Sequence, residues 1–152
     1  MVETDALVGA LLDSCSEQVL ETMFFTPVLD RAAPEDGFGR ERVAVNLVFR
    51  GKPSGAFEVD VDPGAARALA AGFLGIEEAE VVDAQVDQVL AEFTNMTCGS
   101  ALSSLGRVEY FNLDTPETTR YSEYAPHVDG VRRAFLVDHG TLSVCLRVDF
   151  DS

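Results

Sequence analysis

Apolar side chains near the start of the chain recur with the spacing of one face of a helix. They are separated by steps of three and four residues, at Val8, Leu12, Cys15, Val19 and Met23. Pro27 disfavours helical geometry in the residue before it. The pattern therefore predicts a first long amphipathic helix from Asp5 to about Phe25.

A period of two residues replaces this pattern farther along the chain. Apolar and polar side chains alternate from Val43 to Phe49 and again from Ala56 to Asp62. The turn residues Lys52–Gly55 separate the two segments, so together they predict a β-hairpin. Three later segments are also predicted to be strands: Val108–Leu113, Arg133–Val137 and Leu142–Asp149.

Two further helices are predicted between the hairpin and the later strands. The first is the alanine-rich segment Ala65–Leu74, which ends before Gly75. The second is long and runs from Glu78 or Ala79 to Leu105. The two long helices share a short repeat, because residues 17–20 (EQVL) resemble residues 87–90 (DQVL). Two similar halves would explain such a pair, so we expect a pseudo-duplicated fold.

The segments between these elements have the composition of loops. Arg31–Arg40 is rich in glycine and acidic residues, and a polar segment with Pro116 and Pro126 lies between the later strands. The turns inside the strand pairs are too short for parallel crossovers, so the sheet should be mostly antiparallel. We expect one α+β domain spanning 1–152, with an antiparallel sheet packed against the two long helices.

Charge excludes several classes of partner. The chain has 26 acidic and 11 basic residues, which gives a net charge of −15. This field repels nucleic-acid phosphates and anionic lipid surfaces. No apolar run is long enough to cross a bilayer, and no basic segment precedes an apolar one at the N-terminus. We therefore expect a cytoplasmic protein with neither nucleic-acid binding nor membrane insertion.

No metal site is expected in the chain itself. Cys15, Cys98 and Cys145 lie in apolar stretches without a C-x-x-C spacing, so we expect buried, reduced thiols. The acidic residues near the middle of the chain do not form the twelve-residue pattern of a calcium loop. We expect these acidic residues to be solvated helix caps and strand edges: Asp60, Asp62, Glu77, Glu78 and Glu80.

The second long helix carries the most informative polar residues. At about 100° per residue, Glu92 and Asn95 share one face, which points away from the apolar face. Gln88 lies beside them, and Gly99 continues the stripe one turn farther on. These four residues are the candidate site.

A second E-x-x-N sequence lacks this geometry. Glu109 and Asn112 have the same spacing but lie in a predicted strand, where residues three apart face opposite sides. Only the helical pair is followed by a run of small residues that would let another helix approach closely: Gly99, Ser100, Ala101, Ser103 and Ser104.

A long helix with E-x-x-N and a downstream Gly-small-Ala sequence resembles the active-site helix of the CheC, CheX and FliY chemotaxis phosphatases. The order of helices and hairpins is similar to CheX over nearly the whole chain. CheC typically carries E-x-x-N in both halves, whereas CheX keeps one. In the first helix the aligned positions are Thr22 and Phe25, or Glu21 and Phe24 in the neighbouring register, so the resemblance favours CheX. We expect both phenylalanines to pack in the core or at the helix end.

The resemblance implies a phosphatase that removes the aspartyl phosphate from a CheY-type response-regulator receiver domain. It implies that Asn95 positions the attacking water and that Glu92 pairs with a receiver lysine, with Gln88 and Gly99 in supporting positions. Mg²⁺ would be held by the receiver's own carboxylates, so no cofactor is expected in this chain. CheX proteins form homodimers, and a homodimer is therefore expected here.

Two other interpretations remain open. A non-catalytic receiver-binding module, similar to flagellar-switch proteins such as FliM, would share the fold without hydrolysis. A structural or oligomerisation domain would instead pair the closing strands, Arg133–Val137 and Leu142–Asp149, with the sheet edge of a partner. Receiver dephosphorylation that depends on Asn95 would distinguish the phosphatase from both of these alternatives.

Overall fold

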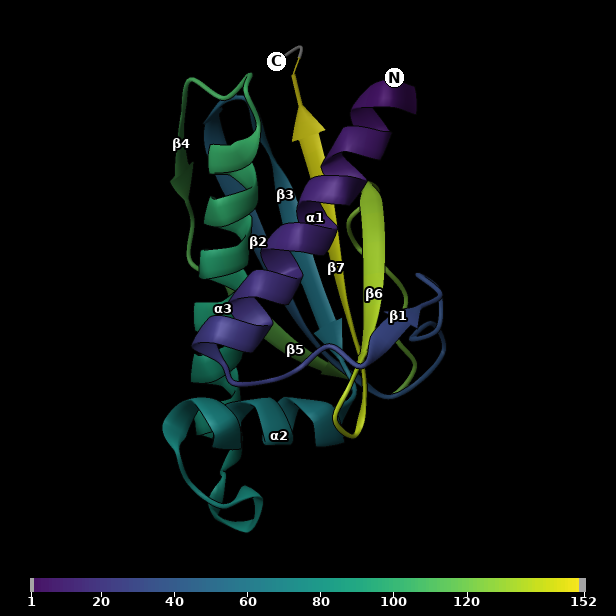
Figure 1. Ribbon diagram of the computed structural model, residues 1–152, viewed down its shortest axis with the longest axis vertical. Helices are drawn as coiled ribbons and strands as arrows, with labels where there is room; N and C mark the ends of the chain where they lie inside the picture. The colour runs from purple at the N-terminus through teal and green to yellow at the C-terminus, as the bar shows by residue number, and fades with distance from the viewer. Residues whose placement is uncertain (1, 151–152) are drawn as a thin grey trace.

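The computed structural model describes residues 2–150 and contains one antiparallel sheet with helices against one of its faces (Figure 1). The helices are α1 (Val2–Met23), α2 (Pro63–Leu74) and α3 (Asp83–Ser104), with the 3₁₀ turn η1 (Glu78–Glu80) before α3. The strands are β1 (Asp30–Ala32), β2 (Arg42–Lys52), β3 (Ser54–Val61), β4 (Tyr110–Leu113), β5 (Glu117–Tyr121), β6 (Val131–Val137) and β7 (Gly140–Asp149). The predicted α+β class, with an antiparallel sheet against two long helices, is confirmed.

The sheet has the strand order β1-β6-β7-β3-β2-β4, and β5 also pairs with β2. β2 is long enough to pair with β5 along Arg42–Asn46 and with β4 along Phe49–Lys52. The closing strands β6 and β7 both lie inside the sheet, because β6 is between β1 and β7 and β7 is between β6 and β3. The suggestion that the closing strands offer a sheet edge to a partner is therefore wrong for β7, which is paired on both sides along Leu142–Leu146. In β6 only Ala134–Leu136 pair with β1, and residues 131–133 pair with β7 alone.

Two strands were not predicted from the sequence. β1 has three residues and pairs only with β6, while β5 has the polar sequence ETTRY and pairs with β2. Both are mostly exposed, so neither shows the alternation that marks a half-buried strand. Their backbones form strands because long neighbouring strands offer free hydrogen-bonding groups.

The helix boundaries follow from local hydrogen bonds. α2 ends at Gly75, whose backbone has a φ of 70° and donates to the carbonyl of Ala71. α3 begins at Asp83, so the predicted start at Glu78 or Ala79 is wrong. The side chain of Gln85 accepts the N–H of Val82 at 2.9 Å and fixes that start.

The main core lies between the helices and the sheet. The ring of Phe24 in α1 stacks on Phe73 of α2, with centroids 4.6 Å apart, and meets Phe93 of α3 edge-on at 5.5 Å. These contacts join the three helices where they approach one another (Figure 1). The three cysteines are free and buried, as predicted.

The other face of the sheet buries charged side chains. Along β3, Phe57 and Val59 belong to the main core, so their neighbours Glu58 and Asp60 face the opposite side. These two carboxylate residues are only 0% and 1% exposed. Asp62 is also buried, so the expectation of solvated edges is wrong for Asp60 and Asp62.

Arginines and a tyrosine satisfy these carboxylates. Arg132 bridges the two, with one nitrogen 2.8 Å from Glu58 and another 2.6 Å from Asp60. Asp60 also accepts from Arg42 at 2.8 Å, and Glu58 accepts from the hydroxyl of Tyr124 at 2.5 Å. Burial raises the pKa of Asp60, although the charges of Arg42 and Arg132 act in the opposite direction. Unpaired carboxylates here would be strongly destabilising.

The same network holds two loops against the sheet. Asp62 accepts from Arg40 and from the N–H of Thr141, both at 2.8 Å, so its side chain does not cap α2. Reciprocal backbone bonds then tie the loop of Arg40 to a second loop, from Gly39 to Tyr124 at 2.8 Å and from Tyr124 to Arg40 at 2.9 Å. Loops thus cover the charged face of the sheet, and the helices pack on the opposite face.

We predict that Arg132→Met lowers the free energy of unfolding by about 3–5 kcal/mol, because it leaves buried carboxylate groups without their shared cation. Arg50→Met is the matched control. Arg50 pairs with Asp114 at 3.3 Å on the surface, so this change should cost less than about 1 kcal/mol. Denaturant unfolding measures both values, and equal effects would show that burial of the network does not matter.

Candidate functional site

α3 presents one apolar face to the core and one polar face to solvent. Its buried side chains are Val86, Val89, Leu90, Phe93, Thr94, Thr97, Cys98, Ala101 and Leu102. On the opposite face Gln88 and Glu92 are exposed, and Asn95 and Gly99 are partly buried. Helical spacing of three and four residues places these four predicted site residues on one stripe.

The two central side chains of this stripe are free to meet a partner. Within residues 2–150, neither Glu92 nor Asn95 makes a side-chain hydrogen bond or an ion pair. A free asparagine amide offers both a donor and an acceptor, whereas an ionised glutamate only accepts. The stripe therefore combines a neutral amide, which can donate and accept hydrogen bonds, with an anionic carboxylate.

The residues behind the stripe hold it in place. Phe93, which is fully buried, lies between Glu92 and Asn95 in the sequence and packs against Phe24 of α1. Thr94 is also fully buried, and its hydroxyl donates to the carbonyl of Leu90 at 2.7 Å. Glu92 and Asn95 thus project from a helix whose inner face is fixed by the core.

Gly99 leaves open space one turn beyond Asn95. A Cβ atom placed on Gly99 would meet no atom within 4 Å. The expectation that the small residues admit another helix is thus not met at Gly99. It holds near the end of α3, where the Sγ of Cys15 in α1 lies 4.0 Å from the Oγ of Ser104. Gly99 thus leaves the helix surface one turn beyond Asn95 without a covering side chain.

α1 runs antiparallel to α3. Cys15 is next to Ser104, and nine residues later Phe24 is next to Phe93. These two contacts set the register of the helix pair. The last residue of α1, Met23, therefore lies about level with Asn95.

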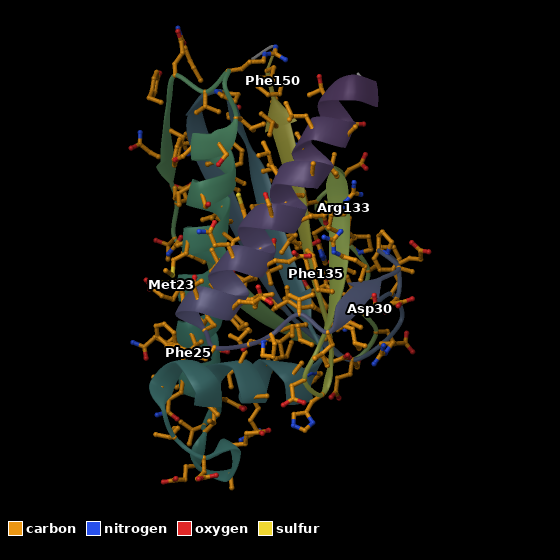
Figure 2. The ribbon with its side chains drawn as sticks, in the orientation of Figure 1. Met23, Phe25, Asp30, Arg133, Phe135 and Phe150 are labelled. Atoms are coloured by element: carbon orange, nitrogen blue, oxygen red, sulfur yellow. The ribbon has the colours of Figure 1, made fainter. Side chains whose placement is uncertain are left out.

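The end of α1 exposes two large apolar side chains beside α3 (Figure 2). Met23 is 44% exposed and Phe25 is 71% exposed. Phe25 also has a φ of 53°, in the left-handed region that is unfavourable for residues with a Cβ. Phe24 packs in the core as predicted, but the same prediction for Phe25 is wrong. Only the backbone geometry after α1 separates the two.

The second E-x-x-N sequence does not form a comparable pair. Glu109 precedes β4, and Asn112 lies within that strand opposite Arg50. Both are exposed, but neither is part of a helix. Asn112 is therefore a natural control for the amide of Asn95.

The sequence matches the family model described as "Chemotaxis phosphatase CheX" over residues 43–138. The chain belongs to this family. The match includes all of α3 and therefore the whole stripe. No curated protein sequence matches the chain.

Solved structures of CheX-like proteins have the same fold. A CheX protein from Vibrio vulnificus is 19% identical, with a TM-score of 0.76 over 92% of this chain and 95% of that one. A putative chemotaxis protein from Desulfovibrio vulgaris Hildenborough is 21% identical, with a TM-score of 0.72 over 93% and 96%. The CheX of the Borrelia burgdorferi CheX–CheY–BeF3–Mg complex is 17% identical, with a TM-score of 0.67 over 91% and 96%.

Other site types find no support in the described chain. Within residues 2–150, no group of three or more His, Cys, Asp or Glu side chains is placed to hold a metal ion. No helix in that range combines the length and apolarity needed to cross a membrane. An open groove of about 730 Å³ near Thr4, Val131 and Phe150 includes none of the four stripe residues.

Gly99 gives a test of whether the open surface is needed for folding. We predict that Gly99→Ala raises the free energy of unfolding by about 0.5–1 kcal/mol, because alanine favours the helix and its Cβ meets no atom. Denaturant unfolding measures this change. A loss of stability would show that the surface is closed in solution.

The thiols give a second test, of whether α3 carries a nucleophile. Burial raises the pKa of Cys98 to about 12 and that of Cys145 to about 11. We predict that neither reacts with iodoacetamide in the folded protein at pH 8, because thiolate is the reactive form. Both should react after unfolding. Rapid modification of Cys98 in the native chain, read by mass spectrometry, would contradict its burial.

Proposed function

We propose that this CheX-family protein hydrolyses the aspartyl phosphate of a CheY-type response-regulator receiver domain. The observation that carries the proposal is the outward pair of Glu92 and Asn95, which have no partner within residues 2–150. A member of the same family from Borrelia burgdorferi has been solved together with CheY, BeF3 and Mg. This supports a phosphorylated receiver as the substrate.

The chemistry needs a water aligned with the phosphorus atom. An aspartyl phosphate is an acyl phosphate, so its carboxylate is a good leaving group and no covalent nucleophile is required. The amide of Asn95 holds the water through its donor and acceptor. Water oxygen bonds to phosphorus, the bond from phosphorus to the aspartyl oxygen breaks, and aspartate and inorganic phosphate are released. A neutral amide does not repel the phosphoryl oxygens.

Glu92 has a different role in this proposal. An anion beside a phosphoryl group is repelled by it, but it pairs well with the lysine that receivers place near the phosphorylated aspartate. This contact positions the receiver so that Asn95 enters its site. Gln88 and Gly99 flank the pair and contribute a polar edge and an open approach.

Mg²⁺ belongs to the receiver in this proposal. The receiver's own carboxylates hold the ion, which neutralises the developing charge on the phosphoryl oxygens. A homodimer is also part of the proposal. Its contact cannot be strand pairing along residues 142–146 of β7, which are already paired on both sides. The mass in solution tests the dimer independently of activity.

We predict that the chain accelerates loss of phosphate from a receiver of the same cell, and that Asn95→Ala reduces this acceleration about a hundredfold through loss of the aligned water. Decay of the phosphorylated receiver in the presence of Mg²⁺ measures both. Asn112→Ala, which removes an exposed amide from β4, should accelerate the decay of the phosphorylated receiver as much as the parent does.

Three outcomes separate the interpretations. An Asn95→Ala variant as fast as the parent would refute the role of the amide. A parent that binds the activated receiver without accelerating its decay would indicate the non-catalytic module. A parent that does neither would refute the proposed partner.

A further inference from the structure

Phe25 is exposed more than any other large apolar residue within residues 4–150. The residue is 71% exposed, so the fold gains little from its apolar side chain. Its φ of 53° would suit glycine better. A phenylalanine at this position therefore serves neither the core nor the turn, and it requires a separate explanation.

The place of Phe25 supplies that explanation. The register of the two helices puts Met23 about level with Asn95, and Phe25 follows it at the end of α1. Figure 2 labels both residues at the end of α1, and Phe24 between them contacts Phe93 of α3, the residue that follows Glu92. The apolar pair and the polar stripe thus lie at the same level along the helix pair, within the reach of one domain-sized partner.

We propose that Met23 and Phe25 form an apolar docking contact for the same receiver domain that presents its phosphoryl group to Asn95. The inference rests on the proposed function and assigns the partner a second contact. One part of the surface, Glu92 and Asn95, acts on the phosphorylated site. The other part, Met23 and Phe25, binds an apolar area next to that site on the receiver.

The solved CheX–CheY complex from Borrelia burgdorferi favours a receiver as the occupant of this surface, and charge disfavours other classes of occupant. Glu21 of α1 and Glu92 of α3 are both exposed, on a chain with a net charge of −15. Anionic membranes and nucleic acids are repelled by this field. A symmetric contact with a second copy would bring like charges together. A receiver with a lysine beside its phosphorylated aspartate instead offers a cation to Glu92.

The two halves of the fold would then have different tasks. Alignment of the four-residue repeat sets Thr22 and Phe25 in the first half against Glu92 and Asn95 in the second. The second half has the pair suited to chemistry, and the first has an apolar side chain at the corresponding place. An apolar contact binds the receiver equally before and during the reaction, so it should affect affinity and not the maximal rate.

The experiment measures binding and hydrolysis separately for each variant. Affinity is measured by calorimetry with a receiver activated by BeF3 and Mg²⁺, and the maximal rate by single-turnover decay at saturating concentrations. We expect Phe25→Gly and Met23→Ser each to weaken binding about tenfold, which corresponds to about 1.4 kcal/mol, with the maximal rate within twofold of the parent. Phe25→Gly should keep or raise the melting temperature, because glycine adopts positive φ freely.

Leu7→Ser is the matched control. Leu7 is 53% exposed near the other end of α1, so its loss removes a similar apolar area away from Asn95. This variant should bind the activated receiver like the parent. Weakening equal to that of Phe25→Gly would overturn the inference, because it would show a general loss of apolar surface and no defined contact.

The remaining outcomes distinguish this inference from the proposed function. Unchanged affinity in Phe25→Gly, with normal hydrolysis, refutes the docking contact and leaves the phosphatase intact. If the parent binds the receiver without hydrolysing its phosphate, and Phe25→Gly loses this binding, the docking contact is supported and the phosphatase is refuted. A lower oligomer mass of Phe25→Gly at unchanged receiver affinity would assign the surface to a second copy and overturn the inference.

Discussion

β3 runs through the middle of the sheet with both of its faces covered, and this double burial constrains the rest of the molecule. On one side Phe57, Val59 and Val61 belong to the core, and α3 packs against this face of β3. On the other side the carboxylates of β3 are buried and require cations, which β2 and β6 supply through Arg42 and Arg132. The helices are therefore confined to one layer, with their outer faces toward solvent.

The candidate site makes use of a surface that folding does not need. The buried half of α3 carries the packing, while Gln88 and Glu92 are exposed and Gly99 meets no neighbour. The residues proposed for function and those that stabilise α3 in the fold are thus different residues of the same helix.

The sequence allowed the main elements and the site stripe to be predicted, because both depend on periodicity in long helices and central strands. It did not reveal β1 and β5, whose pairing is decided by neighbouring strands and not by their own side chains. Asp60 was expected at a solvated edge because alternating acidic residues usually face water, and the arginine that pairs with it comes from position 132. Phe25 looked like its neighbour Phe24, and only the backbone turn after α1 turns its ring outward.

The stripe of α3 that carries Glu92 and Asn95 has a consequence for selectivity. A helix surface is convex, so it cannot enclose a small molecule or strip water from it. Free phosphorylated metabolites would find no walls here and would remain untouched at cellular concentrations. Reaction would require a substrate that supplies its own cavity, metal ion and electrophile. The stripe would add the remaining groups of the active site. Under the proposed function, the protein would be inert until the correct receiver domain binds it.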